Sequence, residues 1–113
     1  MKGIKALIRP PRLYDVIVAV REIAGAPGLT VSEVRGFPRS DEQLPKRSGG
    51  IDLFDSFEMT KVECVVPDEK VALLVETIAR AAHTGNPGDG KIFTSDVQDA
   101  VKIRTGERGK EAI

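Results

Sequence analysis

Three glycines, a proline and a lysine lie close together in the segment Thr84–Lys91. Glycine permits positive φ angles and a close approach of the backbone to a ligand, so this segment is expected to form a sharply turned loop. Backbone N–H groups that face inward, together with the ammonium of Lys91, would bind a phosphate group. The alternative is a tight turn that leads into a strand starting at Ile92–Phe93, and the loop alone favours that alternative.

Part of this loop matches the nucleotide-binding pattern G-x-x-x-x-G-K, which Gly85, Gly90 and Lys91 fit. Ile92, however, stands where a Ser or Thr would hold magnesium. The pattern also follows a strand and opens a helix, whereas this loop follows an expected helix and opens a strand. Both observations exclude a nucleotide-hydrolysing loop of that kind and leave phosphate binding without an evident hydrolytic apparatus.

The composition is that of one ordinary globular domain, 1–113, with a single modest core. The 17 basic and 17 acidic residues cancel, which argues against a nucleic-acid or membrane-surface partner. Cys64 has no second cysteine with which to form a disulfide, as is usual in a reducing compartment. No apolar run approaches the length of a membrane span, so we expect a cytoplasmic protein without direct membrane insertion.

Hydrophobic periodicity predicts two successive units of strand, helix and strand. Strands are expected over Met1–Ile8, Leu29–Phe37, Thr60–Val66 and Lys91–Val97, with a short fifth over Val101–Arg104. Helices are expected from Pro10–Pro11 to about Ala24 and from Pro67–Asp68 to about Ala82, with Asp68 as the N-cap of the second. The charged segment Arg104–Ile113 is expected to end the ordered chain.

The order β-α-β-β-α-β predicts a ferredoxin-like α+β sandwich, in which two helices cover one face of an antiparallel sheet. The expected strands place apolar residues on the other face as well, namely Leu7, Val34 and Val65. A sheet with one wet face alternates more cleanly, so we infer that another subunit covers this second face. The polar segment from Pro38 to about Glu58 is a long loop, either functional or disordered.

The chain resembles the PII signal-transduction (nitrogen regulatory P-II) proteins over nearly its whole length. The most specific matches are Thr84–Gly85, Gly88–Phe93 and Ile103–Glu107, and supporting matches are Thr30–Phe37 and Val65–Asp68. The resemblance implies a homotrimer with a site for ATP or ADP, and possibly for AMP, between subunits; whether magnesium takes part is left open. It also implies a regulator of nitrogen metabolism or of enzymes rather than an enzyme, without catalytic residues or a metal site of its own.

The resemblance assigns the glycine loop, 84–91, to the family's phosphate-binding B-loop. Positions that match nucleotide-binding residues are Thr30, Gly36, Phe37, Pro38, Arg39, Val65, Gly88, Asp89, Gly90, Lys91, Lys102 and Arg104. The long loop, about 38–58, matches the T-loop, which family members insert into a transporter, channel, enzyme or transcription regulator. Its expected partner-binding residues are Ser40, Arg47, Gly50, Asp52 and Phe54.

The departures from the family pattern lie mostly in the long loop. Asp52 stands in place of the tyrosine that many members uridylylate, Ser40 in place of a glutamine that helps bind 2-oxoglutarate, and Met59 in place of a lysine. Pro38 replaces a glycine, which fixes φ and removes an N–H. We therefore expect an atypical member that senses adenine nucleotides without standard 2-oxoglutarate sensing or uridylylation.

Two alternatives remain open. One is a small acylphosphatase-like hydrolase of the same fold, although no nucleophile–base pair is evident. The other is a trimeric metal-tolerance-type protein of similar architecture that binds copper or zinc, although His83 and Cys64 show no ligand spacing. His83 is expected to interact with the end of the second helix rather than to line a pocket, and Tyr14 is expected to serve packing.

Overall fold

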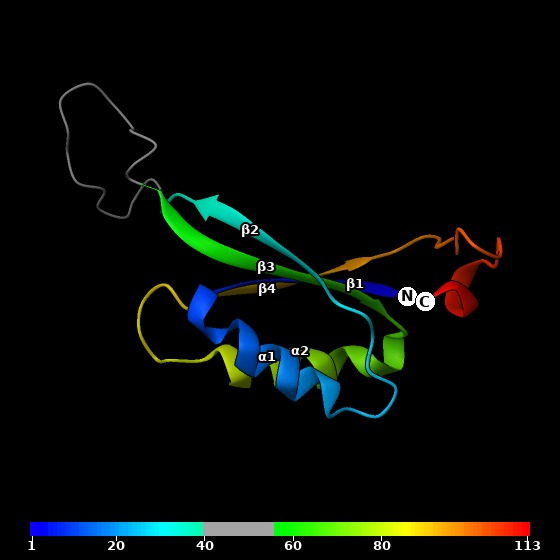
Figure 1. The fold of residues 1–113 in the computed structure, drawn as a ribbon, viewed down its shortest axis with the longest axis horizontal. Helices are drawn as coiled ribbons and strands as arrows, with labels where there is room; N and C mark the ends of the chain where they lie inside the picture. Colours follow the sequence, from blue (N-terminus) through cyan, green and yellow to red (C-terminus); the bar gives the residue numbers. More distant parts are fainter. Residues whose placement is uncertain (40–55) are drawn as a thin grey trace, which may run out of the picture.

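The computed structural model describes residues 1–39 and 56–113, and within them four strands and two helices follow the predicted order (Figure 1). The strands are β1 (Lys2–Ile8), β2 (Thr30–Gly36), β3 (Phe57–Val66) and β4 (Gly90–Asp96), and the helices are α1 (Leu13–Arg21) and α2 (Val71–Ala82). The strands form one antiparallel sheet in the order β2-β3-β1-β4, and both helices cover the same face. The predicted ferredoxin-like α+β sandwich is confirmed.

The core lies between the helices and the sheet, because alternate strand residues point toward the helices. The buried apolar residues that pack together there are Ile4, Ala6, Ile8, Val16, Val20, Val62, Cys64, Val66, Leu74, Ile78 and Ala82. Burial of one large aliphatic side chain contributes roughly 1.5–3 kcal/mol to stability. Cys64 is a small buried hydrophobe, as expected, and burial raises the pKa of its thiol.

The opposite face of the sheet also carries apolar side chains. Leu7, Val34 and Val65 alternate with helix-facing residues and are only partly buried, as the sequence predicts for a second apolar face. Phe57 and Phe93 lie on the same face and remain 42% and 48% exposed. The ammonium of Lys5 lies 5.6 Å from the centre of the Phe93 ring, a cation–π contact on this face.

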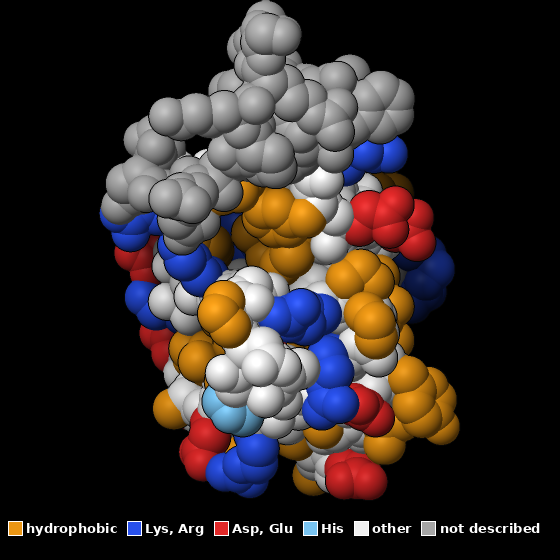
Figure 2. Space-filling model, turned by 90° about the vertical axis from the view of Figure 1, so that its left-hand side faces the viewer, with side chains coloured by type: hydrophobic (Ala, Val, Ile, Leu, Met, Phe, Trp, Pro, Cys, Tyr) orange, Lys and Arg blue, Asp and Glu red, His pale blue; other side chains and the backbone are white. Residues whose placement is uncertain are grey.

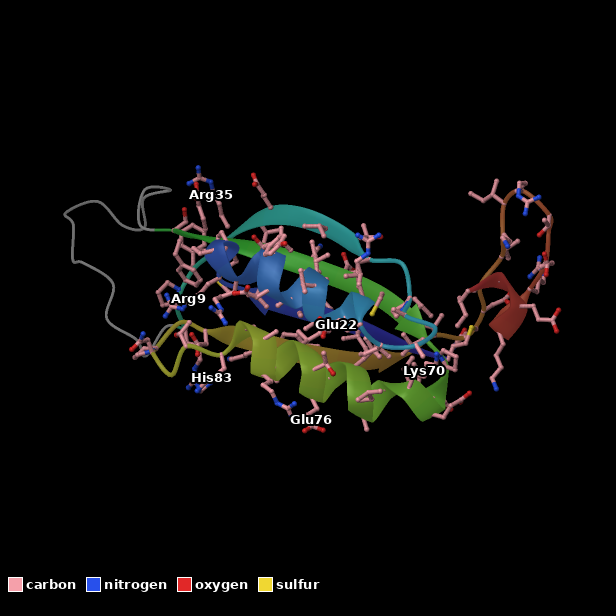
Figure 3. All side chains as sticks on the ribbon, turned by 60° about the horizontal axis from the view of Figure 1, so that its bottom comes forward. Arg9, Glu22, Arg35, Lys70, Glu76 and His83 are labelled. Atoms are coloured by element: carbon pink, nitrogen blue, oxygen red, sulfur yellow. The ribbon has the colours of Figure 1, made fainter. Side chains whose placement is uncertain are left out.

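A basic side chain before each helix binds backbone carbonyls at, or just after, the end of the other helix. Arg12 donates from Nε and Nη2 to the carbonyl of Ala81 in the last turn of α2, at 3.1 and 2.7 Å. Lys70 donates to the carbonyls of Ala24 and Gly25 in the turn that follows α1, at 3.1 and 3.0 Å, and Figure 3 places it at the opposite end of the helix layer from Arg9. Both cations satisfy carbonyls that have no partner within a helix, and Arg12 also opposes the dipole of α2.

Both basic side chains end a short 3-10 turn, Pro10–Arg12 before α1 and Asp68–Lys70 before α2. The expected N-cap role of Asp68 is wrong, because its carboxylate forms no cap hydrogen bond and instead pairs with the amino group of Met1 at 2.9 Å. The extended residue Pro67 occupies the N-cap position of this turn.

The end of α1 and the start of β3 also differ from the prediction. α1 ends at Arg21 rather than near Ala24, because the chain tightens into a bond from the N–H of Ile23 to the carbonyl of Val20 and then reaches Gly25 at φ +69. β3 begins at Phe57 rather than at Thr60, because its first residues pair with the end of β2 as far as Gly36. The strand therefore takes in the last residues of the expected loop.

The predicted fifth strand is reduced to a single bridge between Val101 and Arg108. Gly106 donates its N–H to the carbonyl of Lys102 at 2.7 Å, which closes a tight turn in place of a strand. The segment after Arg104 does not end the ordered chain, because residues Gly109–Ala112 form a further 3-10 turn.

Replacing Arg12 by Met is expected to lower the free energy of unfolding by about 1 kcal/mol, because a partly buried carbonyl at the end of α2 loses a charged donor. Urea denaturation at neutral pH measures the change. Arg80→Met is the matched control, since Arg80 forms an exposed pair with Glu76 of the kind that contributes little. Equal midpoints for the two variants would contradict a capping role for Arg12.

Candidate functional site

A groove of ≈ 570 Å³ opens at the end of the sheet where β2 ends and β4 begins. One wall runs from Gly36, the last residue of β2, to Arg39, and the other is the second part of the glycine loop, from Asn86 to Lys91, which leads into β4. Leu7 and Met59 lie on the sheet beneath them. Figure 2, which faces this end of the molecule, shows basic side chains beside apolar ones.

This groove brings together most of the residues that the sequence assigns to nucleotide binding. They are Gly36, Phe37, Pro38 and Arg39 on one wall and Gly88, Asp89, Gly90 and Lys91 on the other. These two sets are about fifty residues apart in the sequence, and the sheet order places β1 and β3 between the strands that carry them. The volume lies in the range of small-molecule sites.

Lys91 is the basic residue best placed to hold an anion. Its side chain is exposed at the groove, and among residues 1–39 and 56–113 no carboxylate forms an ion pair with it. Arg35 and Arg39 line the opposite wall, and the guanidinium of Arg35 donates to the hydroxyl of Ser56 at 3.1 Å. Cations on both walls favour a ligand with several negative charges.

The glycine loop folds around the carboxylate of Asp89. Its Oδ2 accepts from the backbone N–H groups of Thr84 and Gly85, at 2.8 and 2.9 Å. Its Oδ1 accepts from the hydroxyl of Thr84 and from Nε of Arg9, the latter at 2.9 Å. Arg9 also donates to the carbonyl of Pro87. Asp89 therefore organises the loop from within, and the amides of Thr84 and Gly85 are already occupied.

The same contacts hold the pKa of the Asp89 carboxyl far below its ordinary value. Hydrogen bonds from the hydroxyl and the N–H of Thr84 are the largest causes, followed by the bond from Arg9. All of them favour the charged form. The carboxylate is thus ionised at neutral pH.

The loop must enter β4 through a glycine. Gly90 has φ +100, and a Cβ at this residue would lie 1.7 Å from the carbonyl oxygen of Leu7, which is closer than any contact allows. Gly88, at φ +95, lets the guanidinium of Arg9 lie against the loop, since a Cβ would come within 3.3 Å of Nη2. Both glycines therefore serve the close approach of protein groups.

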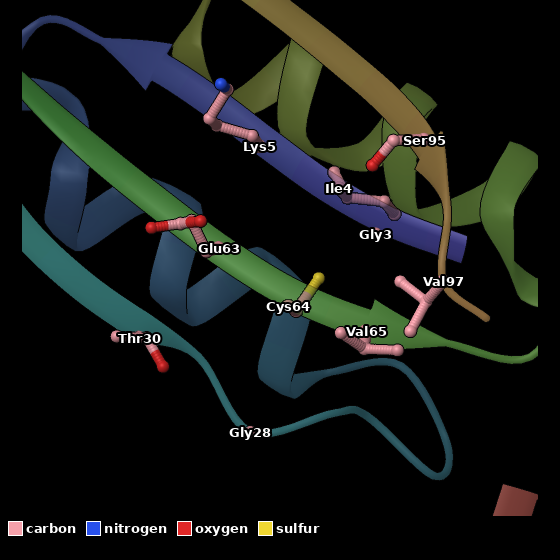
Figure 4. Close-up of a pocket in the computed structure, with 10 residues that line it drawn as sticks. All are labelled: Gly3, Ile4, Lys5, Gly28, Thr30, Glu63, Cys64, Val65, Ser95 and Val97. Carbon is pink, nitrogen blue, oxygen red and sulfur yellow. The ribbon is translucent and has the colours of Figure 1, made fainter. Parts of the chain in front are cut away.

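The remaining predicted residues lie elsewhere on the chain. Thr30 and Val65 line a second hollow of ≈ 400 Å³ with Gly28 and Glu63, shown in Figure 4. It lies where β2 begins and β3 ends, at the other end of the sheet. Lys102 and Arg104 line neither hollow.

Lys102 and Arg104 belong to the C-terminal segment, which Figure 1 places at the opposite end of the molecule from the glycine loop. Both side chains are exposed. Within one subunit the structure therefore does not unite these two residues with Lys91. The expected partner-binding residues Ser40, Arg47, Gly50, Asp52 and Phe54 lie outside the described residues.

Sequence reasoning missed Arg9, whose contacts to Asp89 and Pro87 join positions far apart along the chain. Its only signal is a basic residue directly before two prolines. The packing role expected of Tyr14 is wrong within this subunit, because its side chain is 76% exposed. His83 follows α2 and caps it through its backbone N–H. The sequence predicts that its side chain interacts with the helix end rather than lining a pocket, but it lines a hollow beside the glycine loop, with Nδ1 3.8 Å from the carboxylate of Asp89.

Neither a metal site nor a membrane-spanning helix is found among residues 1–39 and 56–113. No three His, Cys, Asp or Glu side chains gather there in a way that could hold a metal ion. None of the helices in this part of the chain is both long and apolar enough to span a bilayer.

Replacing Asp89 by Asn is expected to lower stability at neutral pH, because the loop loses a charged acceptor for its N–H groups. The folded-state pKa of Asp89 is depressed, so its stabilisation is fully present above about pH 4 and declines as acid protonates the wild-type carboxyl. The gap between wild type and variant should therefore narrow from about pH 4 downward.

Urea denaturation between neutral and acid pH measures this gap, with Asp15→Asn as the control. Asp15 forms an ion pair with Arg12 at 3.1 Å, on the surface of α1. A gap for Asp89→Asn that stayed constant on acidification would show that its carboxylate does not carry the stabilisation.

Residues 1–107 match the profile of the family described as nitrogen regulatory protein P-II. Among similar curated proteins, the nitrogen regulatory protein P-II of Microchaete diplosiphon is 46% identical over the full length of both chains. Nitrogen regulatory protein P-II 2 of Methanothermobacter thermautotrophicus is 50% identical over all of this chain and 97% of that protein.

A solved structure of Arabidopsis thaliana PII bound to citrate superimposes with a TM-score of 0.80 at 36% identity, covering 99% of this chain and 91% of that one. PII regulatory proteins are non-enzymatic signal transducers whose trimers act on target proteins, and the family binds ATP, ADP and 2-oxoglutarate. A full-length match at these identities is decisive: the chain belongs to the nitrogen regulatory protein P-II family.

Proposed function

We propose that this protein senses the balance of ATP, ADP and AMP and passes the result to a partner protein through its long loop, about 38–58. The observation that supports it most is the groove, in which the glycine loop with Lys91 faces the segment Gly36–Arg39. This segment is the base of the long loop, so a ligand that touches both walls is in direct contact with the signalling element. A change in the number of phosphates on the bound nucleotide would then alter the conformation of the loop base.

The nucleotide site is completed by a second subunit in this proposal. The groove and the hollow of Thr30 and Val65 lie at opposite ends of one sheet face, and Lys102 and Arg104 lie near the second end. Two different half-sites on one chain meet when copies join head to tail, and such contacts close into a ring. The partly apolar sheet face supplies surface for a trimer of this kind.

The 2-oxoglutarate response is proposed to be weak or absent. Met59, which stands in place of the family's lysine, is 7% exposed and lies beneath the groove. Its thioether offers no charge to a dicarboxylate that must give up water around two negative groups. Ser40, in place of the glutamine, is shorter, and Pro38 at the groove wall has no N–H to donate.

Uridylylation of a tyrosine is likewise proposed to be absent. Tyr14 is the only tyrosine of the chain, and it lies on α1 rather than in the long loop. Asp52 stands in the loop where the modified tyrosine is found in many relatives. Mass spectrometry after incubation with a uridylyltransferase checks this, and a stoichiometric nucleotidyl adduct in residues 38–58 would contradict it.

Lys91→Ala is expected to weaken ADP binding by about 1.5–3 kcal/mol, roughly 10- to 150-fold in Kd, because the phosphates lose a charge-assisted contact. Calorimetry measures the affinity, and light scattering on the same samples should report a trimer for both proteins. Lys2→Ala is the control, since Lys2 pairs with Asp96 away from the groove. Unchanged affinity would remove Lys91 from the site, and a stable monomer would remove the shared site.

Titration of 2-oxoglutarate into wild-type protein saturated with Mg-ATP is expected to give no binding in the micromolar range. The double variant Met59→Lys, Ser40→Gln is the positive arm, because it returns the two side chains that the family uses for this ligand. Micromolar binding by the wild type would restore ordinary carbon–nitrogen sensing as the function.

A further inference from the structure

We propose that Arg9 is a positioning residue of the phosphate site, which keeps the glycine loop receptive to anions by neutralising Asp89. This inference rests on the proposed nucleotide site. Arg9 follows β1 directly, and its side chain is about one-third exposed at 33%. Figure 3 places it at the glycine-loop end of the molecule, near His83.

Arg9 compensates a negative charge that would otherwise face the phosphate site. Asp89 and Lys91 both line the groove, so a free carboxylate there would offset the lysine and repel a phosphate. The guanidinium of Arg9 contacts this carboxylate through Nε at 2.9 Å. His83, the other titratable group close to the carboxylate, lies further away at 3.8 Å. Arg9 therefore supplies the nearest compensating charge.

Arg9 also fixes the shape of the glycine loop. Arg9 also donates to the carbonyl of Pro87, so one side chain binds two points of the loop. Gly88 has no Cβ, and this absence leaves room for the guanidinium against the backbone. The carboxylate of Asp89 is thus held between the guanidinium of Arg9 on one side and the backbone N–H groups of Thr84 and Gly85 on the other.

The donors and acceptors around Asp89 make the role of Arg9 testable by substitution. In Asp89→Asn, the amide oxygen can take the place of Oδ2 and accept from Thr84 and Gly85, while the NH2 group donates to the Thr84 hydroxyl. That NH2 group then faces Nε–H of Arg9, so two donors oppose each other. In Arg9→Met, the carboxylate instead keeps its charge without its cation. Combining both changes removes both conflicts.

The experiment is a double-mutant cycle on Arg9→Met and Asp89→Asn, with ADP, AMP and adenosine titrated by calorimetry. Arg9→Met should weaken ADP binding at least about fivefold, with a smaller loss for adenosine because the effect acts on phosphate. The double variant should bind ADP at least about threefold more tightly than Arg9→Met alone. Arg9→Lys, which keeps the charge, should recover part of the affinity.

Equal ADP affinity for wild type and Arg9→Met would overturn the proposal. So would a double variant that binds no better than Arg9→Met, because Arg9 would then act as a direct phosphate ligand or through general stability. Amide hydrogen exchange at Thr84 and Gly85 reads the loop without nucleotide, and it should be faster in Arg9→Met and slower again in the double variant. If wild type bound no ADP, the proposed function would fail, and the exchange rates would still decide whether Arg9 positions the loop.

Discussion

The turn between β1 and α1 positions the end of α2 and the glycine loop through two arginines. Arg12 binds the last turn of α2 at Ala81, and Arg9 binds the glycine loop that follows it. The entry into β4 depends on the same region, since Gly90 lies against the carbonyl of Leu7 in β1. The end of α2, the loop and the start of β4 therefore take their positions from one short segment of the N-terminal half. A groove that needs a fixed loop wall depends on these contacts first.

The helix layer has an internal symmetry that supports this arrangement. Arg12 and Lys70 occupy equivalent places at the end of a 3-10 turn. Arg12 binds the last turn of α2 at Ala81, and Lys70 binds the turn at Ala24 and Gly25 that follows α1. Antiparallel helices make such an exchange possible, because the start of one lies beside the end of the other. The helices are thereby tied together without using the open face of the sheet. That face and both half-sites remain available for contacts between subunits.

The sequence predicts the elements well because alternation and helical spacing are local signals. Boundaries fail where non-local pairing decides, as at Phe57, which becomes a strand residue through its register with Gly36. The glycine loop forms the sharp turn that its sequence predicts, but the same residues suit both a phosphate cradle and a carboxylate-centred turn. Only the fold shows that the carboxylate of Asp89 accepts hydrogen bonds from the backbone N–H groups of Thr84 and Gly85. The local sequence around Arg9 does not predict its contacts, since its partner Asp89 is separated from it by most of the chain.

In the proposed nucleotide site, the division into two half-sites has a consequence for signalling. The groove holds the glycine loop and the base of the long loop, whereas Thr30, Val65 and the basic pair Lys102 and Arg104 lie at the other end. A nucleotide that joined these parts across a head-to-tail ring would bind each subunit to its neighbour. Its phosphates would then decide how strongly one subunit's basic residues attract the other's groove wall. The loop base at Gly36–Arg39 is part of that wall, so the number of phosphates and the position of the loop would be coupled through the same contacts.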